Sequence, residues 1–184
     1  MTDFEPELLI VDEVKAVISR SEEQQIELFV YAVISANRIF VGGAGRSGLM
    51  MKAFAMRLMH LGLSAHVVGE TITPAIEPGD LMVVGTGSGQ TRTTLTLVEA
   101  ASNRGARTAV ITAHPNAPVA VAADIILEIR APITSAATWA PSVQPPGSLF
   151  EQSLLILCDG LVMRLMQRLG TTHEEMRARH TKLE

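Results

Sequence analysis

The sequence predicts an α/β fold, a three-layer sandwich in which helices flank a five-stranded parallel sheet. Short apolar runs alternate with helical segments through the middle of the 184-residue chain, and this alternation favours parallel strands joined by right-handed crossovers. Two of the apolar runs end in glycine-rich loops. Because ligands of such sheets bind beyond the carboxyl ends of the strands, the two loops are expected to border one crevice.

Two amphipathic helices are predicted ahead of the first strand, within residues 1–36. Residues 4–20 place apolar side chains at helical spacing. Ser21, with Gln24 three residues later, is a capping-box signal for a second helix that extends to about Ala36. A plain nucleotide-binding core does not need these helices, so we expect them to pack against a partner subunit.

The parallel core is predicted to span residues 37–130. Its strands are expected at the apolar runs 38–41, 64–68, 80–84, 108–112 and 124–129. Its helices are expected at 49–61, 91–103 and, more briefly, from His114 to about Ala123. The first of them is rich in methionine, which indicates packing in a core or an interface.

Residues 131–147 contain four prolines, several hydroxyl side chains and the only tryptophan. They predict a long loop with little regular structure, and such loops in compact domains tend to be functional.

Two helices are predicted within residues 148–184. Ser148 begins a long apolar helix that Gly170 ends. Thr171, with Glu174 three residues later, predicts the cap of a short charged helix. The long helix is apolar on several faces, so we expect it to be buried in the core or in an oligomer.

Composition limits the possible classes of protein. The length suits a single domain of residues 1–184. The net charge is −4 and no basic patch with interleaved aromatics occurs, so nucleic-acid binding is not expected. Apolar residues make up 47% of the chain without a run long enough to span a membrane. The apolar excess is better explained by subunit interfaces.

The cysteine content and the N-terminus indicate a cytoplasmic protein. The lone cysteine, Cys158, lies in an apolar helical run, which favours a buried packing thiol over a nucleophile. A chain with one cysteine has no internal disulfide and suits a reducing compartment. The acidic start lacks the basic-then-apolar layout of a signal peptide.

The second glycine-rich loop, Gly85–Thr91, combines three glycines with three hydroxyl side chains. Glycines let backbone amides approach a ligand, the hydroxyls of Thr86, Ser88 and Thr91 add donors, and the following helix adds unpaired amides and its positive dipole end. This combination favours a site for a phosphate or sugar phosphate over a plain turn capped by Thr91.

The first glycine-rich loop suggests a rival hypothesis. Residues 43–48 match G-x-G-x-x-G, and Glu70 ends the next predicted strand, where a dinucleotide enzyme places its ribose-binding acid. However, the chain is short for a cofactor domain plus a substrate domain. Arg46 and Ser47 also occupy positions where backbone must approach the pyrophosphate. We therefore favour sugar-phosphate binding over dinucleotide binding at this loop.

Glu151 has two interpretations. Ser148-x-x-Glu151 is a capping box, but a carboxylate at a helix start beside the proline-rich loop is also well placed as a proton-transfer base. The two roles can coexist. His180 lies in a charged terminal segment typical of a surface histidine, and His60 is expected to be structural. No Cys/His cluster has metal-ligand spacing, so no metal site is expected.

Several motifs resemble those of the hexulose-phosphate isomerases in the SIS (sugar isomerase) domain family. They are Val41-Gly-Gly-Ala-Gly-Arg-Ser-Gly48, Leu58-Met-His-Leu-Gly62, Val67-Val-Gly-Glu-Thr71, Pro74-Ala-Ile76, Gly79-Asp80, Gly85-Thr-Gly-Ser-Gly-Gln-Thr91, Gly147-Ser-Leu-Phe-Glu-Gln152 and Arg179-His-Thr-Lys-Leu-Glu184. The Ser-Gly-x-Thr loop alone marks only the sugar-phosphate superfamily. The ordered set, which spans nearly the whole chain, is much more specific.

The resemblance implies interconversion of D-arabino-3-hexulose 6-phosphate and fructose 6-phosphate, the second step of formaldehyde fixation in the ribulose monophosphate pathway. It also implies the SIS fold, which is flavodoxin- and Rossmann-like, a homotetramer, and no cofactor. Alternatives are an isomerase acting on arabinose 5-phosphate or sedoheptulose 7-phosphate, and a non-catalytic module that senses a sugar phosphate.

The resemblance further implies a site. The substrate-binding residues would be Gly45, Arg46, Ser47, Thr86, Ser88, Gly89, Gln90 and Thr91. Among them, the side chains of Ser47, Ser88 and Thr91 and the amides of Gly89 and Gln90 would hold the phosphate.

The same resemblance assigns two catalytic groups. Glu151 would be the base, and His180, from the same or a neighbouring subunit, would be an acid or a carbonyl polariser. The sequence departs slightly from the family pattern, with Thr86 where serine is common and Thr181-Lys182 in place of smaller or amide residues.

Overall fold

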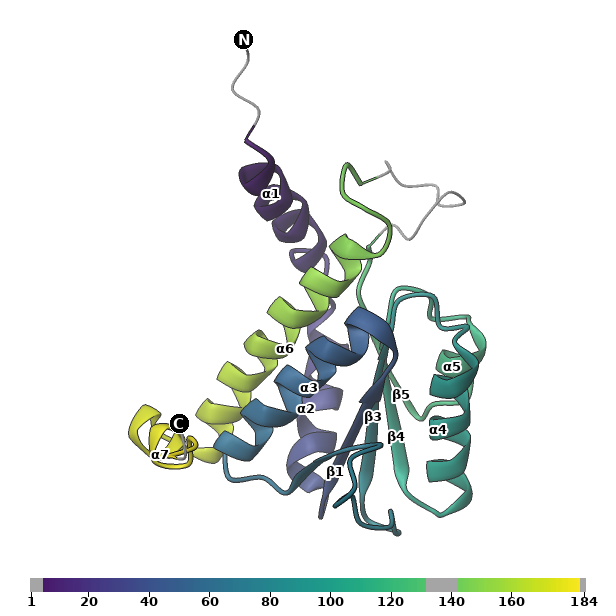
Figure 1. Ribbon diagram of the computed structural model, residues 1–184, viewed down its shortest axis with the longest axis vertical. Coiled ribbons are helices and arrows are strands. Elements are labelled where there is room, and N and C mark those ends of the chain that lie inside the picture. The colour runs from purple at the N-terminus through teal and green to yellow at the C-terminus, as the bar shows by residue number, and fades with distance from the viewer. Residues whose placement is uncertain (1–4, 132–141, 183–184) are drawn as a thin grey trace.

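The computed structural model describes residues 5–131 and 142–182 and is built on a five-stranded parallel sheet (Figure 1). The strands are β1 (Ile39–Gly43), β2 (Ala65–Val67), β3 (Leu81–Thr86), β4 (Arg107–Thr112) and β5 (Ile125–Glu128). Their order is β2-β1-β3-β4-β5, and every neighbouring pair is parallel. The predicted fold class is confirmed. The strand order reverses between β1 and β3, the point at which open α/β sheets bind ligands.

Helices form a layer on each face of the sheet (Figure 1). One face carries α2 (Glu23–Ser35), α3 (Gly45–His60) and α6 (Ser148–Leu169), with α1 (Pro6–Ile18) packed on α6. The other face carries α4 (Arg92–Asn103) and α5 (Pro118–Val121). The short α7 (His173–Ala178) follows α6 at the end of the molecule opposite α1.

Side chains of alternate strand residues divide the interior into two cores, as the period of two in a strand requires. In β3, Leu81 and Val83 belong to the larger core, beneath α2, α3 and α6, whereas Met82 and Val84 belong to the smaller core, beneath α4 and α5. Cys158 is buried in the larger core, where burial, with a smaller contribution from the charge of Asp159, raises the pKa of its thiol. The prediction of a packing thiol is confirmed.

The helix α3 begins earlier than expected. It was predicted from Leu49 but begins at Gly45, so that residues 45–48 form its first turn and not a loop. Ala44 is the N-cap residue and has an extended backbone. As a result, the glycine-rich segment contributes the unpaired amides of a helix N-terminus to the carboxyl edge of the sheet.

Two capping signals were placed wrongly. The N-cap of α2 is Glu22, with no side-chain cap, so Ser21 does not form the predicted box. The box of α7 is shifted by one residue: Thr172 accepts from the amide of Glu175, and the Glu175 carboxylate accepts from the amide of Thr172. Helix boundaries defined only by short polar signals are the least secure kind.

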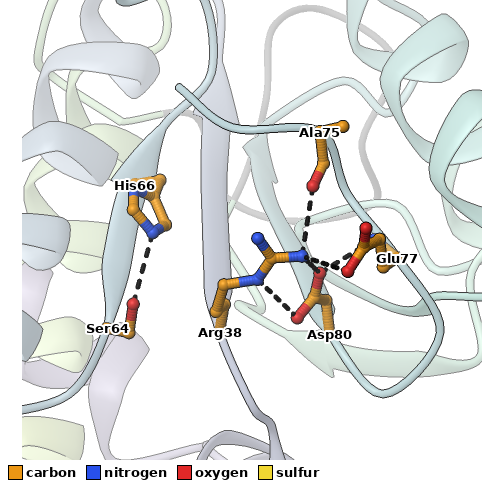
Figure 2. A network of polar contacts seen from close by, with 6 residues as sticks. All are labelled: Arg38, Ser64, His66, Ala75, Glu77 and Asp80. Carbon is orange, nitrogen blue, oxygen red and sulfur yellow. Dashed lines mark hydrogen bonds and ion pairs between the residues drawn. The ribbon is translucent and has the colours of Figure 1, made fainter. Parts of the chain in front are cut away.

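Arg38 ties the amino-terminal ends of β1 and β3 to the segment before β3 (Figure 2). Its guanidinium donates from Nε and Nη2 to the two carboxylate oxygens of Asp80, at 3.0 and 2.6 Å, and Nη2 also donates to Glu77 and to the carbonyl of Ala75. The amide of Glu77 donates to Asp80 as well, at 2.8 Å. Asp80 is 2% exposed, so this bidentate pair is largely desolvated.

Replacing Asp80 by Asn should lower the free energy of unfolding at neutral pH by about 3 kcal/mol, because it leaves the Arg38 charge partly buried without its partner. Burial raises the pKa of Asp80, but hydrogen bonds from Arg38 and Glu77 and the Arg38 charge outweigh it, and the pKa lies below its ordinary value. The folded pKa is therefore lower than the unfolded one. The stabilisation is complete above the unfolded pKa of about 4 and is lost as the pH falls through the folded pKa.

Urea unfolding at pH 7 and below pH 4 checks this prediction, with the exposed Asp159→Asn as control. A difference between Asp80→Asn and wild type that did not shrink in acid would contradict the ion-pair explanation.

In the described part of the chain, no helix is long and apolar enough to cross a membrane.

Candidate active site

A cavity of about 190 Å³ opens at the carboxyl ends of β1 and β3, beside the start of α6. Its lining residues are Ala44, Ser47, Gly85, Thr86, Gly87, Ser88, Thr91, Gly147, Phe150 and Glu151. The two glycine-rich segments therefore share one crevice, as predicted, and the start of α6 forms a third wall.

Close packing between β1 and α3 explains two glycines of the first segment. A Cβ on Gly48 would lie 2.6 Å from the carbonyl oxygen of Gly43, and one on Gly43 would lie 3.0 Å from the Cα of Gly48. Side chains at these positions would push the helix away from the strand end. The glycines thus hold the first turn of α3, with Ser47, against the cavity.

The second glycine-rich loop is held by its own hydroxyls. The amide of Gly89 donates to Thr86 Oγ1 at 3.3 Å, and the amide of Gln90 donates to Ser88 Oγ at 3.3 Å. Gly89 has a φ of +63°, and a Cβ there would lie 2.5 Å from the Cβ of Ala117, so only glycine fits. Each hydroxyl accepts one of these bonds and keeps its own hydrogen for donation to a ligand in the cavity.

Glu151 does not cap α6. The N-cap residue is Gly147, in the left-handed conformation with φ of +86°, and no side chain accepts a capping hydrogen bond. The Glu151 carboxylate instead accepts from Arg46 Nη1 at 3.0 Å, and the same nitrogen donates to Ser148 Oγ at 3.0 Å. The capping interpretation of Ser148 and Glu151 is therefore wrong, and the carboxylate is available at the cavity wall.

The electrostatic arrangement suits a carboxylate that acts as a base. The Glu151 side chain is 18% exposed and faces the cavity, whereas its partner Arg46 is 46% exposed. The hydrogen bond between them is charge-assisted. Hydroxyl donors from the β3 loop and the N-termini of α3 and α6 surround the same space. The cavity can thus hold an anionic group beside a proton acceptor.

His180 lies elsewhere in the chain. Its ring stacks on that of His60, with centroids 5.2 Å apart, and Arg179 Nη1 donates to the His60 carbonyl at 3.1 Å. Burial lowers the pKa of His60, and His180 and Arg57 lower it further. His60 ends α3, whereas Arg46 lies in its first turn. At 1.5 Å per residue the two ends are about 22 Å apart, so one chain does not bring His180 to its own cavity.

The predicted site residues thus fall into three groups. Those lining the cavity are Ser47, Thr86, Ser88, Thr91 and Glu151. Arg46 contacts Glu151 directly, while Gly45, Gly89 and Gln90 belong to the supporting backbone. His180 is distant, as His60 is, and His60 is buried, as a structural residue would be.

Sequence reasoning missed Ala44 and Phe150 as lining residues and Ser148 as a partner of Arg46. Ala44 lies between two glycines whose expected role was phosphate binding. Phe150 is almost wholly buried, as is typical of a core residue. Phe150 also lies inside the motif that carried Glu151, so the motif itself was the available signal.

The position of Glu70 does not support the dinucleotide hypothesis. Glu70, its proposed ribose ligand, forms an exposed ion pair with Lys52 at 3.2 Å and does not line the cavity. Among the described residues, no three His, Cys, Asp or Glu side chains lie close enough together to hold a metal ion.

An apolar groove of about 690 Å³ lies on the other side of Arg46. Its lining residues are Ile10, Val11, Val14, Lys15, Ile18, Ser19, Arg46, Met50, Gln152, Leu155 and Ile156. It is formed by α1, the start of α3 and the start of α6. Arg46 therefore separates the polar cavity from an apolar surface.

Known proteins resemble this chain over most of its length. The SIS domain model matches residues 32–156. The 3-hexulose-6-phosphate isomerase of Bacillus subtilis is 39% identical over 170 residues, which cover 92% of this chain and 90% of that protein. The enzyme of the same name from Mycobacterium gastri is 39% identical over 176 residues, which cover 96% of this chain and 88% of that protein.

A solved structure agrees with these sequence comparisons. A protein from Methanococcus jannaschii, for which the function of a 3-hexulose-6-phosphate isomerase has been inferred, superposes with a TM-score of 0.86 at 30% identity. The superposition covers 98% of this chain and 100% of that one.

Proposed function

The chain belongs to the SIS domain family, and we propose that it is a 6-phospho-3-hexuloisomerase, like its relatives from Bacillus and Mycobacterium. It interconverts D-arabino-3-hexulose 6-phosphate and fructose 6-phosphate, the isomerisation step of the ribulose monophosphate pathway. The observation that carries this proposal is the cavity itself, which Glu151 lines together with the hydroxyl-rich β3 loop.

The proposed division of labour follows the chemistry of the two walls. Ser47, Ser88 and Thr91 hold the phosphate of the substrate at the N-termini of α3 and α4, because a helix N-terminus favours an anion. Glu151 lines the cavity at the start of α6, and its proposed position in the complex is beside the reacting carbons. Arg46 donates to the carboxylate of Glu151, and this contact supports a role with the substrate's oxygens.

The reaction removes one proton from a carbon of the substrate and returns one to the neighbouring carbon. Glu151 takes the proton from C2 of the 3-hexulose, and the electrons of that C–H bond form the C2–C3 double bond of an enediol as the C3 carbonyl oxygen gains negative charge. A proton also moves from the C2 hydroxyl to the C3 oxygen, so that return of the carbon-bound proton to C3 re-forms a carbonyl at C2 and leaves a hydroxyl on C3. A single carboxylate serves both transfers when they occur on one face.

Charge on the enediolate oxygens must be stabilised as it develops. Preorganised donors do this best in a site partly shielded from water. The proposed donors are Arg46, the loop hydroxyls and His180 from a neighbouring subunit. The distant phosphate fixes the sugar, so that its binding energy is used at the reacting carbons.

Solvent exchange tests the function directly. The protein is incubated with fructose 6-phosphate in deuterium oxide, and the sugar is analysed by NMR. A 2,3-enediol places deuterium at C3 of fructose 6-phosphate. Label at C1 would indicate an aldose–ketose isomerase instead, and tight binding without label would indicate a sensing module. Arabinose 5-phosphate and sedoheptulose 7-phosphate, tested in the same way, separate the other isomerases.

Replacing Ser88 by Ala should raise KM for fructose 6-phosphate by roughly tenfold or more and leave kcat within a few-fold. The reason is the loss of one hydrogen bond to a charged group, which contributes about 1.5–3 kcal/mol. Steady-state kinetics measure this effect, and Ser102→Ala on the exposed side of α4 is the matched control. An unchanged KM would contradict the phosphate assignment.

We also propose a homo-oligomer, a tetramer, in the cytoplasm. The apolar groove beside Arg46 and the exposed Leu8, Val11 and Ile156 support an interface between copies, since large exposed apolar patches usually mark interaction sites. The oligomer would bring His180 of one copy to the cavity of another. The lone buried cysteine suits a reducing compartment.

A further inference from the structure

Glu13 on α1 holds the segment that leads into α6. Its Oε2 accepts from Ser142 Oγ at 2.7 Å and from Gln144 Nε2 at 2.8 Å, and its Oε1 accepts from the amide of Val143 at 3.0 Å. Gln144 in turn donates its amide to Ser142 Oγ at 3.1 Å. One carboxylate thus fixes three consecutive residues that are about 130 positions away in the sequence.

The connection from these residues to the active site is short and stiff. The amide of Ser148 donates to the carbonyl of Pro145 at 3.1 Å and closes a four-residue turn. Pro146 and Gly147 are the central residues, and Gly147 has φ of +86° and ψ of −23°, which is the geometry of a type II turn with proline and glycine in their preferred places. Proline fixes its own φ, so the turn transmits the position of Gln144 to Gly147 with little freedom.

The turn ends at the candidate base. Gly147 caps α6 and its carbonyl accepts the amide of Glu151 at 3.1 Å, the first hydrogen bond of that helix. A Cβ on Gly147 would lie 3.6 Å from Glu151 Oε1, so the turn borders the carboxylate itself. The position of the turn therefore sets where the first turn of α6 enters the cavity.

We propose that Glu13 is a positioning residue for the isomerase: through Ser142–Gln144 and the Pro146-Gly147 turn, it sets the placement of Glu151 against the substrate. This inference rests on the proposed role of Glu151. Under this proposal, α1 positions a catalytic group of its own chain, in addition to forming the interface that its exposed apolar face suggests.

The chemistry of Glu13 matches this task. An ionised carboxylate is an acceptor only, and Glu13 meets three donors. Burial raises the pKa of Glu13, but the hydrogen bonds from Gln144, Ser142 and Val143 outweigh it and leave the pKa below its ordinary value. A glutamine here would keep one acceptor oxygen and point an NH₂ donor at other donors, so Glu13→Gln is a nearly isosteric test.

Glu13→Gln should lower kcat by roughly tenfold, because small displacements of a catalytic group have large effects on rate, and should change KM less than threefold. The matched control is Asp12→Asn, the exposed neighbouring acid on the same helix. Coupling is tested with Ser142→Ala: in that background Glu13→Gln should cost less than it does in wild type, because the two residues share one network.

Hydrogen–deuterium exchange of the whole protein provides a readout that does not require turnover. The Val143 amide, bonded to Glu13, should exchange faster in Glu13→Gln and not in Asp12→Asn. Faster exchange with an unchanged kcat, or a loss of kcat that is fully additive with Ser142→Ala, would overturn the positioning role. A wild-type protein that exchanges no substrate proton would overturn the isomerase proposal, while the amide exchange would still report whether the Glu13 contacts hold the segment.

Discussion

Replacing Glu151 by Gln should lower kcat by about 10²–10⁴-fold, the usual contribution of a general base, with substrate binding largely kept. The amide has nearly the shape of the carboxylate but does not accept a proton at working pH. The Glu151 side chain lies in the wall of the cavity that the loop proposed to hold the phosphate also lines. Loss of proton transfer and retention of phosphate binding are therefore expected in the same variant.

Three measurements together test this prediction. Single-turnover kinetics should give the loss in rate, solvent deuterium incorporation at C3 of fructose 6-phosphate should fall in parallel, and the Kd for fructose 6-phosphate should change only a few-fold. Glu99→Gln, an exposed acid on α4, is the matched control. Near-normal turnover would leave Glu151 as merely the ion-pair partner of Arg46, and a large rise in Kd would place it in ground-state binding.

Replacing His180 by Ala should lower kcat by roughly 10²-fold, a typical effect of removing an acid or an electrostatic stabiliser. The effect is expected although His180 stacks on His60 at the end of α3 away from its own cavity. In the proposed oligomer, the imidazole acts in a neighbouring subunit. The alternative is that His180 serves only the packing of α7.

Mixing two inactive variants separates these alternatives. When Glu151→Gln and His180→Ala subunits are mixed in equal parts and allowed to exchange, sites that take the carboxylate from one copy and the imidazole from the other should recover. For a site shared by two copies, random mixing restores about a quarter of the wild-type activity.

The control is a preparation of the chain that carries both substitutions, which should stay inactive. Normal activity of His180→Ala alone would assign the residue to packing. Failure of the exchanged mixture to recover activity, with mixed oligomers demonstrated by mass spectrometry, would contradict a shared site.

The sheet and most helices could be predicted because their signals are local. An apolar run such as Leu81–Val84 is buried on both faces, and only a parallel strand between two helical layers satisfies that burial. The long helix from Ser148 to Leu169 was placed correctly because Gly170 ends it in the left-handed conformation. The crevice between the two glycine-rich segments followed from the edge at which parallel strands end.

The parts of the site that escaped prediction depend on distant contacts. Ser148-x-x-Glu151 has the letters of a capping box, but Gly147 takes the N-cap position and Arg46, 105 residues away, takes the carboxylate. Nothing in either segment alone reveals that pairing. Glu13 was one acid in an amphipathic helix, and its three donors lie 129 to 131 residues further along.

The late position of α6 in the chain has a consequence for biosynthesis. This helix contributes eight buried residues, among them Phe150 and Leu154, to the larger core, yet it begins only at Ser148. On the ribosome, all five strands and the helices α2 and α3 are synthesised before α6. Until α6 is made, the apolar side chains that pack against it lack that partner, and exposed apolar surfaces are prone to aggregate. The candidate base, one wall of the cavity and the last part of the larger core are therefore all supplied by one late helix.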